Sequence, residues 1–385
     1  RLTKQIAPRT LICATTFRVG GSAADTGYHE LRRLAAAADD KRSLAIGMAG
    51  YLTTLAFTSH HKEASALASE LHALAESIAD PTITVGLVPA AAQAKYEAGE
   101  LGECLRFAQR VIDLAGDDAA MGDVMVATPL AWAYTLRGTA RMCLGHRGWL
   151  ADLDRGLDIA MAFDLTSRCN AALYKYVVAY QNLTVLPDDS ARVRTAEWLR
   201  IADESGDPTT MTLVRLIRGV ALVHSGNEFH DAAMQLLFQA HDHLARLSNG
   251  LRRLADVEIA RVSAARGNPA RAIATVEQVL DEACRTGEKI TRASATTVLV
   301  ESLLDRGGTG DLRRARTAVD ALAADPAVPR SAVDEVTTLR LRARMAAMAD
   351  DTDDYFAWVG RYRAAAEQAG FIGHLCDARA MAGLP

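Results

Sequence analysis

Apolar residues recur along most of this chain with the spacing of an α-helix and not with the alternation of a β-strand. Two runs show this most plainly: Leu67, Leu71, Leu74 and Ile78, and Ile273, Val276, Val279 and Leu280. Ala, Leu and Arg, which favour helices, are abundant, and segments of alternating β-branched residues are missing. The pattern predicts an all-α chain.

Helix stop and start signals recur about every 41 residues. They stand near Asp80-Pro81, Gly122-Asp123, Asp164, Asp207-Pro208, Asn249-Gly250, Gly287, Pro329 and Gly370. A second series of turns, each followed five residues later by a small or apolar residue, runs out of phase with the first. Gly267 with Ala272 is its clearest case. Two interleaved series at one period predict two helices in each repeat.

Repeats of two helices form an α-solenoid, because a single pair cannot bury its apolar face and must stack on its neighbours. We predict about eight tetratricopeptide-like pairs between residues 40 and 370, a helix near residues 28–39 before them and a capping helix at Phe371–Met381. The period exceeds the roughly 34 residues of a standard tetratricopeptide repeat, so HEAT-type pairs are the structural alternative. Residues 28–385 are thus one repeat domain, and residues 1–27 are a linker or a degenerate repeat.

The composition is that of a globular chain, with 50% hydrophobic residues and a formal net charge of −4. It argues against disorder and against a general polyanion binder. Arginines cluster in the C-terminal half, but acids dilute them, so we do not expect this region to bind nucleic acid. The longest uncharged run, residues 43–61, contains Thr53, Thr54 and Thr58, and we interpret it as a repeat helix and not as a membrane span. We expect a cytoplasmic protein, cut from a longer one because residue 1 is Arg.

The six cysteines are widely scattered, which excludes local zinc knuckles and redox pairs. They are Cys13, Cys104, Cys143, Cys169, Cys284 and Cys376. We predict that they are small buried hydrophobes in a reducing compartment.

Motifs for catalysis are missing from the sequence. The run Gly307–Gly310 has no Lys-Ser/Thr after it and is not a phosphate loop, and neither GxSxG nor HExxH occurs. His241 and His243 lie two apart on a predicted helix, point to different sides and cannot chelate one metal ion. We therefore expect no catalytic residue, no metal ligand and no cofactor in this chain.

The middle repeats carry aromatic and amide side chains that suit a ligand groove. If the first helix of each pair lines the concave face, seven residues would face it: Gln93, Tyr96, Trp132, Thr135, Asn170, Tyr174 and Gln181. The alternative is that these residues are ordinary core between repeats.

Two stretches resemble a known family. They are Ala140–Trp149 with Asp152–Asp154, and Tyr362–Ala364 with Ala369–His374 and Ala378–Met381. Both are similar to the C-terminal helical repeats of actinobacterial, especially mycobacterial, signalling proteins. In that family a class III adenylate/guanylate cyclase domain is followed by a STAND-type ATPase and then by these repeats, and some relatives carry a LuxR-type DNA-binding domain. The resemblance implies that ATP and a divalent metal would belong to the parent protein.

The leading hypothesis is a regulatory module that binds a protein, a peptide or a small effector in its groove and restrains attached ATPase and cyclase domains. The alternatives are the effector-binding arm of a LuxR/MalT-like transcription regulator and a stand-alone tetratricopeptide adaptor.

Overall fold

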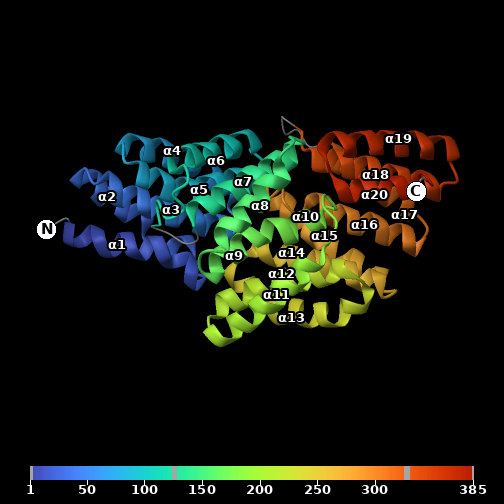
Figure 1. Cartoon of the computed structure of the whole chain (residues 1–385), viewed down its shortest axis with the longest axis horizontal. Helices are drawn as coiled ribbons and strands as arrows, with labels where there is room; N and C mark the ends of the chain where they lie inside the picture. The colour runs from blue at the N-terminus through green and yellow to red at the C-terminus, as the bar shows by residue number, and fades with distance from the viewer. Residues whose placement is uncertain (1–2, 124–127, 325–329, 384–385) are drawn as a thin grey trace.

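The computed structural model describes residues 3–123, 128–324 and 330–383, and the regular structure in these ranges is helical throughout (Figure 1). Its main body is a series of eight helix pairs in which consecutive helices pack together. The pairs are α3 (Lys41–Phe57) with α4 (His61–Ile78), α5 (Pro81–Glu97) with α6 (Leu101–Ala115), α7 (Pro129–Leu144) with α8 (Trp149–Ala160), α9–α10 (Leu165–Gln181) with α11 (Asp189–Ser205), α12 (Pro208–Ser225) with α13 (His230–Leu247), α14 (Asn249–Ala265) with α15 (Pro269–Thr286), α16 (Arg292–Arg306) with α17 (Asp311–Ala323), and α18 (Ala332–Met348) with α19 (Thr352–Ala369).

The predicted α-solenoid and its repeat length are therefore confirmed. The pairs begin at residues 41, 81, 129, 165, 208, 249, 292 and 332. Asp80 and Asp207 are N-caps whose carboxylates accept backbone N–H groups, each with Pro at the next position. Ala272, the small residue of the second series, is fully buried where α15 meets α14. The expected stop signal at Pro329 lies outside the described residues.

Further elements extend the array at both ends. They are α1 (Thr3–Thr15), the 3-10 turns η1 (Thr16–Val19) and η2 (Ala23–Thr26), α2 (Tyr28–Ala38), the 3-10 turn η4 (Asn227–Phe229) within the fifth pair, and α20 (Ile372–Met381). The predicted helices at 28–39 and 371–381 correspond to α2 and α20. Within residues 1–27, α1 packs on α3, where Cys13 donates to the carbonyl of Gly47 at 2.9 Å.

The array coils so tightly that its later pairs touch its earlier ones. The amide of Lys289, in the turn after α15, donates to the carbonyl of Glu97 at the end of α5 (3.2 Å). Close by, Arg253 on α14 donates to Ser59, in the turn after α3, at 3.3 Å. Contacts of this kind join residues that lie about one superhelical turn apart. We call the interface that these contacts form between earlier and later pairs the seam.

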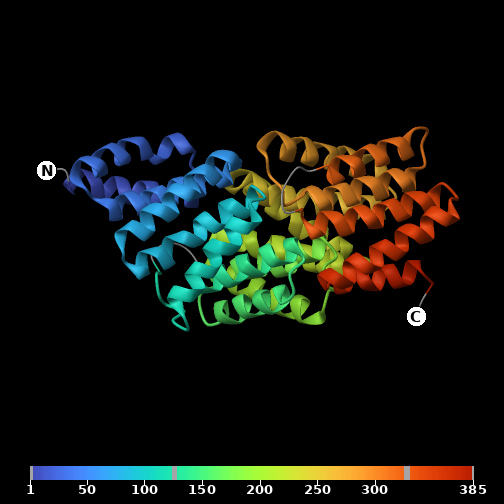
Figure 2. The same ribbon diagram turned by 90° about the horizontal axis from the view of Figure 1, so that it is seen from above.

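The last pair and α20 continue the seam. The indole N–H of Trp149 donates to the carbonyl of Ala369 at 3.1 Å, and Nε2 of His374 donates to the carbonyl of Asn182 at 2.8 Å. Burial lowers the pKa of His374 to about 3, so the ring is neutral at pH 7. Figure 2 shows the resulting body from above, with the two ends of the chain at opposite ends of the long axis.

The cysteine prediction holds for only part of the set. Cys13, Cys104 and Cys169 are buried, whereas Cys143 is half-buried, and Cys284 and Cys376 are exposed. The last two lie on the outer faces of α15 and α20, where the helical pattern alone does not separate a small apolar side chain in the core from one at the surface.

The long uncharged run forms α3 and the turn after it, as predicted. Most of the second half of α3 is buried by neighbouring helices. Over the described ranges, the structure contains no helix that combines the length and the apolar character needed to span a membrane.

Thiol reactivity checks these burial assignments. Burial raises the pKa of Cys13 and of Cys143 to about 12, which suppresses the reactive thiolate. We expect two thiols per native chain, Cys284 and Cys376, to react rapidly with a disulfide reagent at pH 8, and the others only after unfolding. Rapid reaction of Cys104 or Cys169 would contradict the structure.

A glycine pair tests the seam. A Cβ on Gly373 of α20 would lie 2.5 Å from the carbonyl oxygen of Leu183, whereas a Cβ on Gly360 of α19 meets nothing within 4 Å. We expect Gly373→Ala to destabilise the protein by about 1–3 kcal/mol through overpacking. Gly360→Ala should stabilise it by about 0.5–1 kcal/mol, because Ala favours the helix. Chemical denaturation followed by circular dichroism measures both, and equal effects would show that α20 does not dock tightly.

Candidate functional site

A cavity of about 530 Å³ lies inside the superhelix, and we call it the central cavity. Its walls come mainly from the first helices of the pairs, namely α3, α5, α7, α9, α12 and α14, with η1 and the segment before α16. Its volume falls in the range of about 300–1,000 Å³ that small-molecule sites occupy. The concave face of the solenoid is therefore partly enclosed.

Four of the seven predicted groove residues line this cavity. They are Gln93 on α5, Trp132 on α7, Asn170 on α9 and Tyr174 in the segment that follows it. Gln93, Trp132 and Asn170 are half-buried, while Tyr174 is buried. Burial raises the pKa of Tyr174 well above its usual value, so its hydroxyl stays protonated.

The other three predicted residues lie between helices and do not line the central cavity. Tyr96 packs edge-on against Tyr174, with 5.9 Å between ring centroids, and so supports that ring from behind. Thr135 is fully buried and donates to the carbonyl of Ala131 at 2.8 Å. Gln181 donates to the carbonyl of Leu254 at 2.8 Å and fastens α10 to α14. The register estimated from standard repeats fails here because the helices are longer.

The helix that carries Asn170 and Tyr174 is irregular. A π-helical segment, η3 (Leu173–Val178), joins α9 (Leu165–Ala172) to α10 (Ala179–Gln181). Leu173, Tyr174 and Val178 of this segment line the cavity. π-helical turns are rare and are frequent at functional sites, where they re-aim side chains. No signal in the amino-acid sequence predicted this segment.

Glu97, which the sequence analysis missed, lies deep in the wall beside Gln93. Its carboxylate accepts from the Gln93 amide at 2.7 Å and lies 3.2 Å from Nδ1 of His61. The Glu97 side chain is 11% exposed and that of His61 is 2% exposed. Gln93 and Glu97 are four residues apart, so the helical spacing could have linked them. The same Glu97 also holds the seam through its carbonyl.

Glu288 lines the same cavity from the other side of the seam, in the later turn of the superhelix. Its carboxylate accepts from the amide of Thr291 at 2.9 Å and from the hydroxyl of Thr291 at 2.6 Å. The guanidinium of Arg253 lies 3.3 Å from it, with both side chains almost fully buried. Glu288 belongs to the turn before α16 and not to a first helix, so no repeat-based count could have placed it here.

Helix N-caps form the outer rim of the cavity. Asp164 caps α9 by accepting from the amide of Ser167 at 2.9 Å, and Asp207 caps α12 by accepting from that of Thr210 at 2.9 Å. Burial opposes ionisation of Asp207, but the bonds from Thr210 and Thr209 prevail and hold its pKa below the usual value. The sequence predicted both residues as helix starts. Their place at the rim follows from the stacking of successive pairs.

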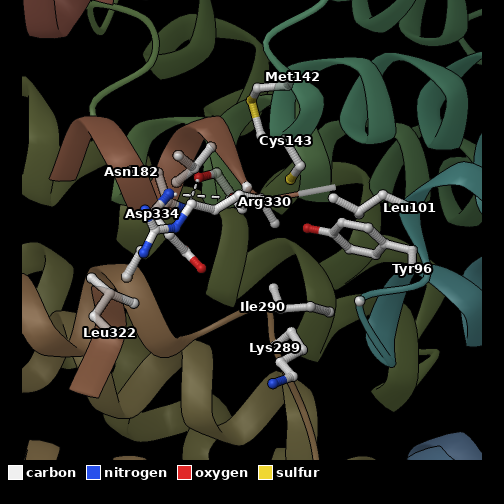
Figure 3. A pocket seen from close by; sticks show the side chains of 15 residues that line it. Tyr96, Leu101, Met142, Cys143, Asn182, Lys289, Ile290, Leu322, Arg330 and Asp334 are labelled. Carbon is white, nitrogen blue, oxygen red and sulfur yellow. Dashed lines mark hydrogen bonds between the residues drawn. The ribbon is translucent and has the colours of Figure 1, made fainter. Parts of the chain in front are cut away.

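Two further cavities lie along the seam. One of about 50 Å³ is bordered by Tyr96, Lys289 and Asp334 and has room for little more than one or two waters (Figure 3). The other, of about 520 Å³, is polar and lies where α14 and α15 meet the turn after α3.

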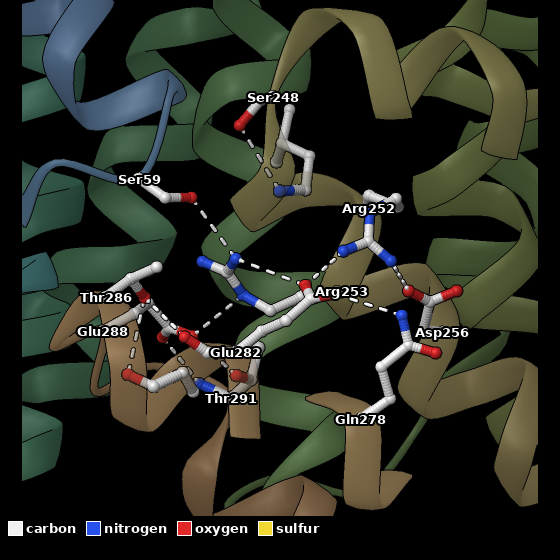
Figure 4. A network of polar contacts seen from close by, with 12 residues as sticks. Ser59, Ser248, Arg252, Arg253, Asp256, Gln278, Glu282, Thr286, Glu288 and Thr291 are labelled. Carbon is white, nitrogen blue, oxygen red and sulfur yellow. Dashed lines mark hydrogen bonds and ion pairs between the residues drawn. The ribbon is translucent and has the colours of Figure 1, made fainter. Parts of the chain in front are cut away.

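The polar seam cavity is bordered by ion pairs that hold the helices together (Figure 4). Arg252 bridges Asp256, at 2.6 Å, and Glu282, while Arg253 reaches Glu288 and Ser59. The two arginines on α14 are thus already matched by carboxylates of the protein. The central cavity is therefore the better candidate for a ligand.

In the part of the chain that the structure describes, no group of three or more His, Cys, Asp or Glu side chains is placed so that it could bind a metal ion. His241, one of the two histidines considered in the sequence analysis, instead pairs through Nε2 with Asp256 on α14 at 3.0 Å.

Comparison with protein-family models gives no match for this chain, and comparison with curated proteins gives none. The resemblance to actinobacterial signalling proteins therefore stays an expectation from short motifs. The functional argument depends on the geometry of the cavity.

A half-buried carboxyl beside the seam predicts a pH dependence. Burial raises the pKa of Asp334 to about 6, although Arg292, Lys289 and Arg330 oppose the shift. In the unfolded chain this carboxyl ionises near pH 4. From about pH 4 to pH 6 the folded protein thus holds a proton that the unfolded chain has lost, and stability falls as pH rises through this window.

We therefore expect Asp334→Asn to stabilise the protein more at pH 7.5 than at pH 4.5. Thermal unfolding of wild type and variant at both pH values measures the difference. Asp158→Asn, at an exposed position on α8, is the control and should give the same small effect at both. A pH-independent gain from Asp334→Asn would contradict the assigned pKa.

Proposed function

We propose that this chain is the effector-sensing module of a larger signalling protein, and that its effector is a small molecule bound in the central cavity. One observation carries the proposal: the cavity is bounded by residues from both sides of the seam. Phe57 and Glu97 come from the first two pairs, and Leu254 and Glu288 from the sixth pair and the turn after it. A ligand there contacts both turns of the superhelix at once.

Such a ligand would favour the closed superhelix. A ligand shifts a conformational equilibrium only as far as it binds one state more tightly than the other. If the seam opens, the wall from Glu288 and Leu254 moves away from the wall with Glu97, and the ligand loses its contacts to one of the two walls. Binding and seam closure are then coupled by the same free energy in both directions.

The coupling gives the module an output. Domains attached to a solenoid that opens and closes change their spacing and orientation, which suffices to restrain or release an enzyme. Following the resemblance, we propose that these domains are an ATPase and a nucleotide cyclase and that the chain itself has no catalytic role. Support for this step is the resemblance alone, whereas the cavity supports the sensing role.

An aromatic pair tests the sensing role. Trp132 lines the cavity, whereas Trp358 on α19 stacks with Arg342 and Arg361 outside it. In the full-length protein from the native gene, we expect a small-molecule fraction of the cell extract to change nucleotide turnover. Trp132→Ala should raise the amount needed for half of the response about tenfold or more, the scale expected for losing a buried aromatic anchor. Trp358→Ala should leave the response unchanged.

The two variants are compared at a temperature where circular dichroism shows both folded. An equal response of wild type and Trp132→Ala would contradict a role of the central cavity. The response of nucleotide turnover to the extract should also depend on residues 28–385. If the flanking domains respond in the same way after these residues are removed, the proposal as a whole is contradicted.

A further inference from the structure

The central cavity has a marked charge imbalance. Five of its described lining residues carry a carboxylate: Glu97, Asp123, Asp164, Asp207 and Glu288. Among the lining residues in the described ranges, the only lysine or arginine is Arg18 of η1. The rim aspartates Asp164 and Asp207 are offset in part by the helix N-termini that they cap. The carboxylate of Glu288 is offset by the amide of Thr291, the N-cap residue of α16, and by Arg253. The carboxylate of Glu97 lies at the C-terminal end of α5 and contacts Gln93 and His61 instead, so it is the least compensated carboxylate of the interior.

The interior wall of the cavity presents mainly hydrogen-bond acceptors. Two protein donors, Gln93 and His61, approach the carboxylate of Glu97, which has about four lone-pair sites. When the neutral ring of His61 donates through Nδ1 to Glu97, its Nε2 is left as an acceptor. His61 is 2% exposed, lines the cavity, and its Nε2 has no hydrogen-bond partner among the described residues. The missing element at this wall is a hydrogen-bond donor.

Aromatic and apolar side chains supply the rest of the surface. Phe57, Trp132 and Tyr174 line the cavity together with Leu213 and Leu254. Aromatic rings attract cations through their negative faces and also pack against apolar groups. A ligand that carries both a cationic donor and an apolar body would match the two halves of the lining.

We propose that the effector of the central cavity is a small organic cation, an amine or guanidine on an apolar or aromatic body, whose N–H groups bind at Glu97. This inference rests on the proposed sensing function and names the chemical class of its ligand. The positive group would lie beside Glu97 and His61, close to the seam bond that the Glu97 carbonyl receives from Lys289. The apolar body would extend toward Trp132 and Tyr174.

Three probes of similar size and different charge test the ligand class. They are 2-phenylethylamine, 2-phenylethanol and phenylacetate, titrated into the purified 385-residue chain at pH 7 by isothermal calorimetry. We expect the amine to bind at least about tenfold more tightly than the alcohol, the size of one hydrogen bond to a charged group. Phenylacetate should bind most weakly. Added salt should weaken the binding of the amine and leave that of the alcohol nearly unchanged.

Three variants locate the bound probe. Glu97→Gln keeps the shape of the side chain and should remove most of the preference for the amine over the alcohol. Asn170→Trp should fill the cavity and weaken the binding of the amine and the alcohol alike. Glu103→Gln, which removes an exposed carboxylate paired with Arg106 on α6, is the matched control and should change neither. Melting curves verify that each variant is folded at the temperature of titration.

The outcomes separate this inference from the proposed function. If the alcohol binds as tightly as the amine, or if none of the three probes binds, the cationic class is wrong while the response to cell extract can still stand. If the amine binds and Asn170→Trp does not weaken it, the amine occupies an acidic surface outside the cavity, and the inference fails. If the amine preference disappears only in Glu97→Gln, the assignment holds.

Discussion

The amide of Lys289 donates to the carbonyl of Glu97, and through that bond the superhelix returns to its own beginning. An open tetratricopeptide-like array would present a groove along its length. Here the pairs coil until later ones pack on earlier ones, and the seam converts part of the groove into an enclosed cavity. The bonds of Trp149 to Ala369 and of His374 to Asn182 repeat the same closure farther along. Enclosure is what makes this surface suitable for a small ligand, because a cavity buries far more of a ligand than an open groove does.

The fold could be predicted from the sequence because its rules are local. Caps such as Asp80 and Asp207, the turn at Gly267 and the buried Ala272 each depend on a few neighbouring residues, and each repeat follows the same rules. Stacking then follows, because no pair can bury its apolar face alone. The pitch of the superhelix has no such local rule. It is the sum of small rotations between pairs, and the seam that results joins residues nearly 200 positions apart, as Arg253 and Ser59 show.

The candidate site could be predicted only in part for the same reason. Gln93, Trp132 and Asn170 lie on the inner faces of first helices, where counting from each turn places them. Gln181 and Thr135 were misplaced because the register drifts over helices longer than those of a standard repeat. Glu97 sits at the end of its helix beside the seam, and Glu288 lies in a turn of a distant pair. His61 reaches Glu97 from the helix just before it, α4, whereas Glu288 comes to the same cavity only because the array coils. The chemistry of the site, which combines carboxylates from both sides of the seam with aromatic rings, is thus a property of the superhelix.

The distance across the seam tests this account most directly. Pulsed electron resonance between two spin labels measures this distance. One label is placed on the native, exposed Cys284 of α15 and the other on Glu63→Cys of α4, and Cys376→Ser removes the other exposed thiol. Glu63 lines the polar seam cavity, and Cys284 directly precedes Arg285, which lines it from the other side, where Lys62 lies close to Gly287. The account predicts a short, narrow distance distribution for the free chain, sharpened further by a cavity ligand. A broad distribution at long distances, unchanged by any ligand, would show that the superhelix is open in solution and that the central cavity does not exist there.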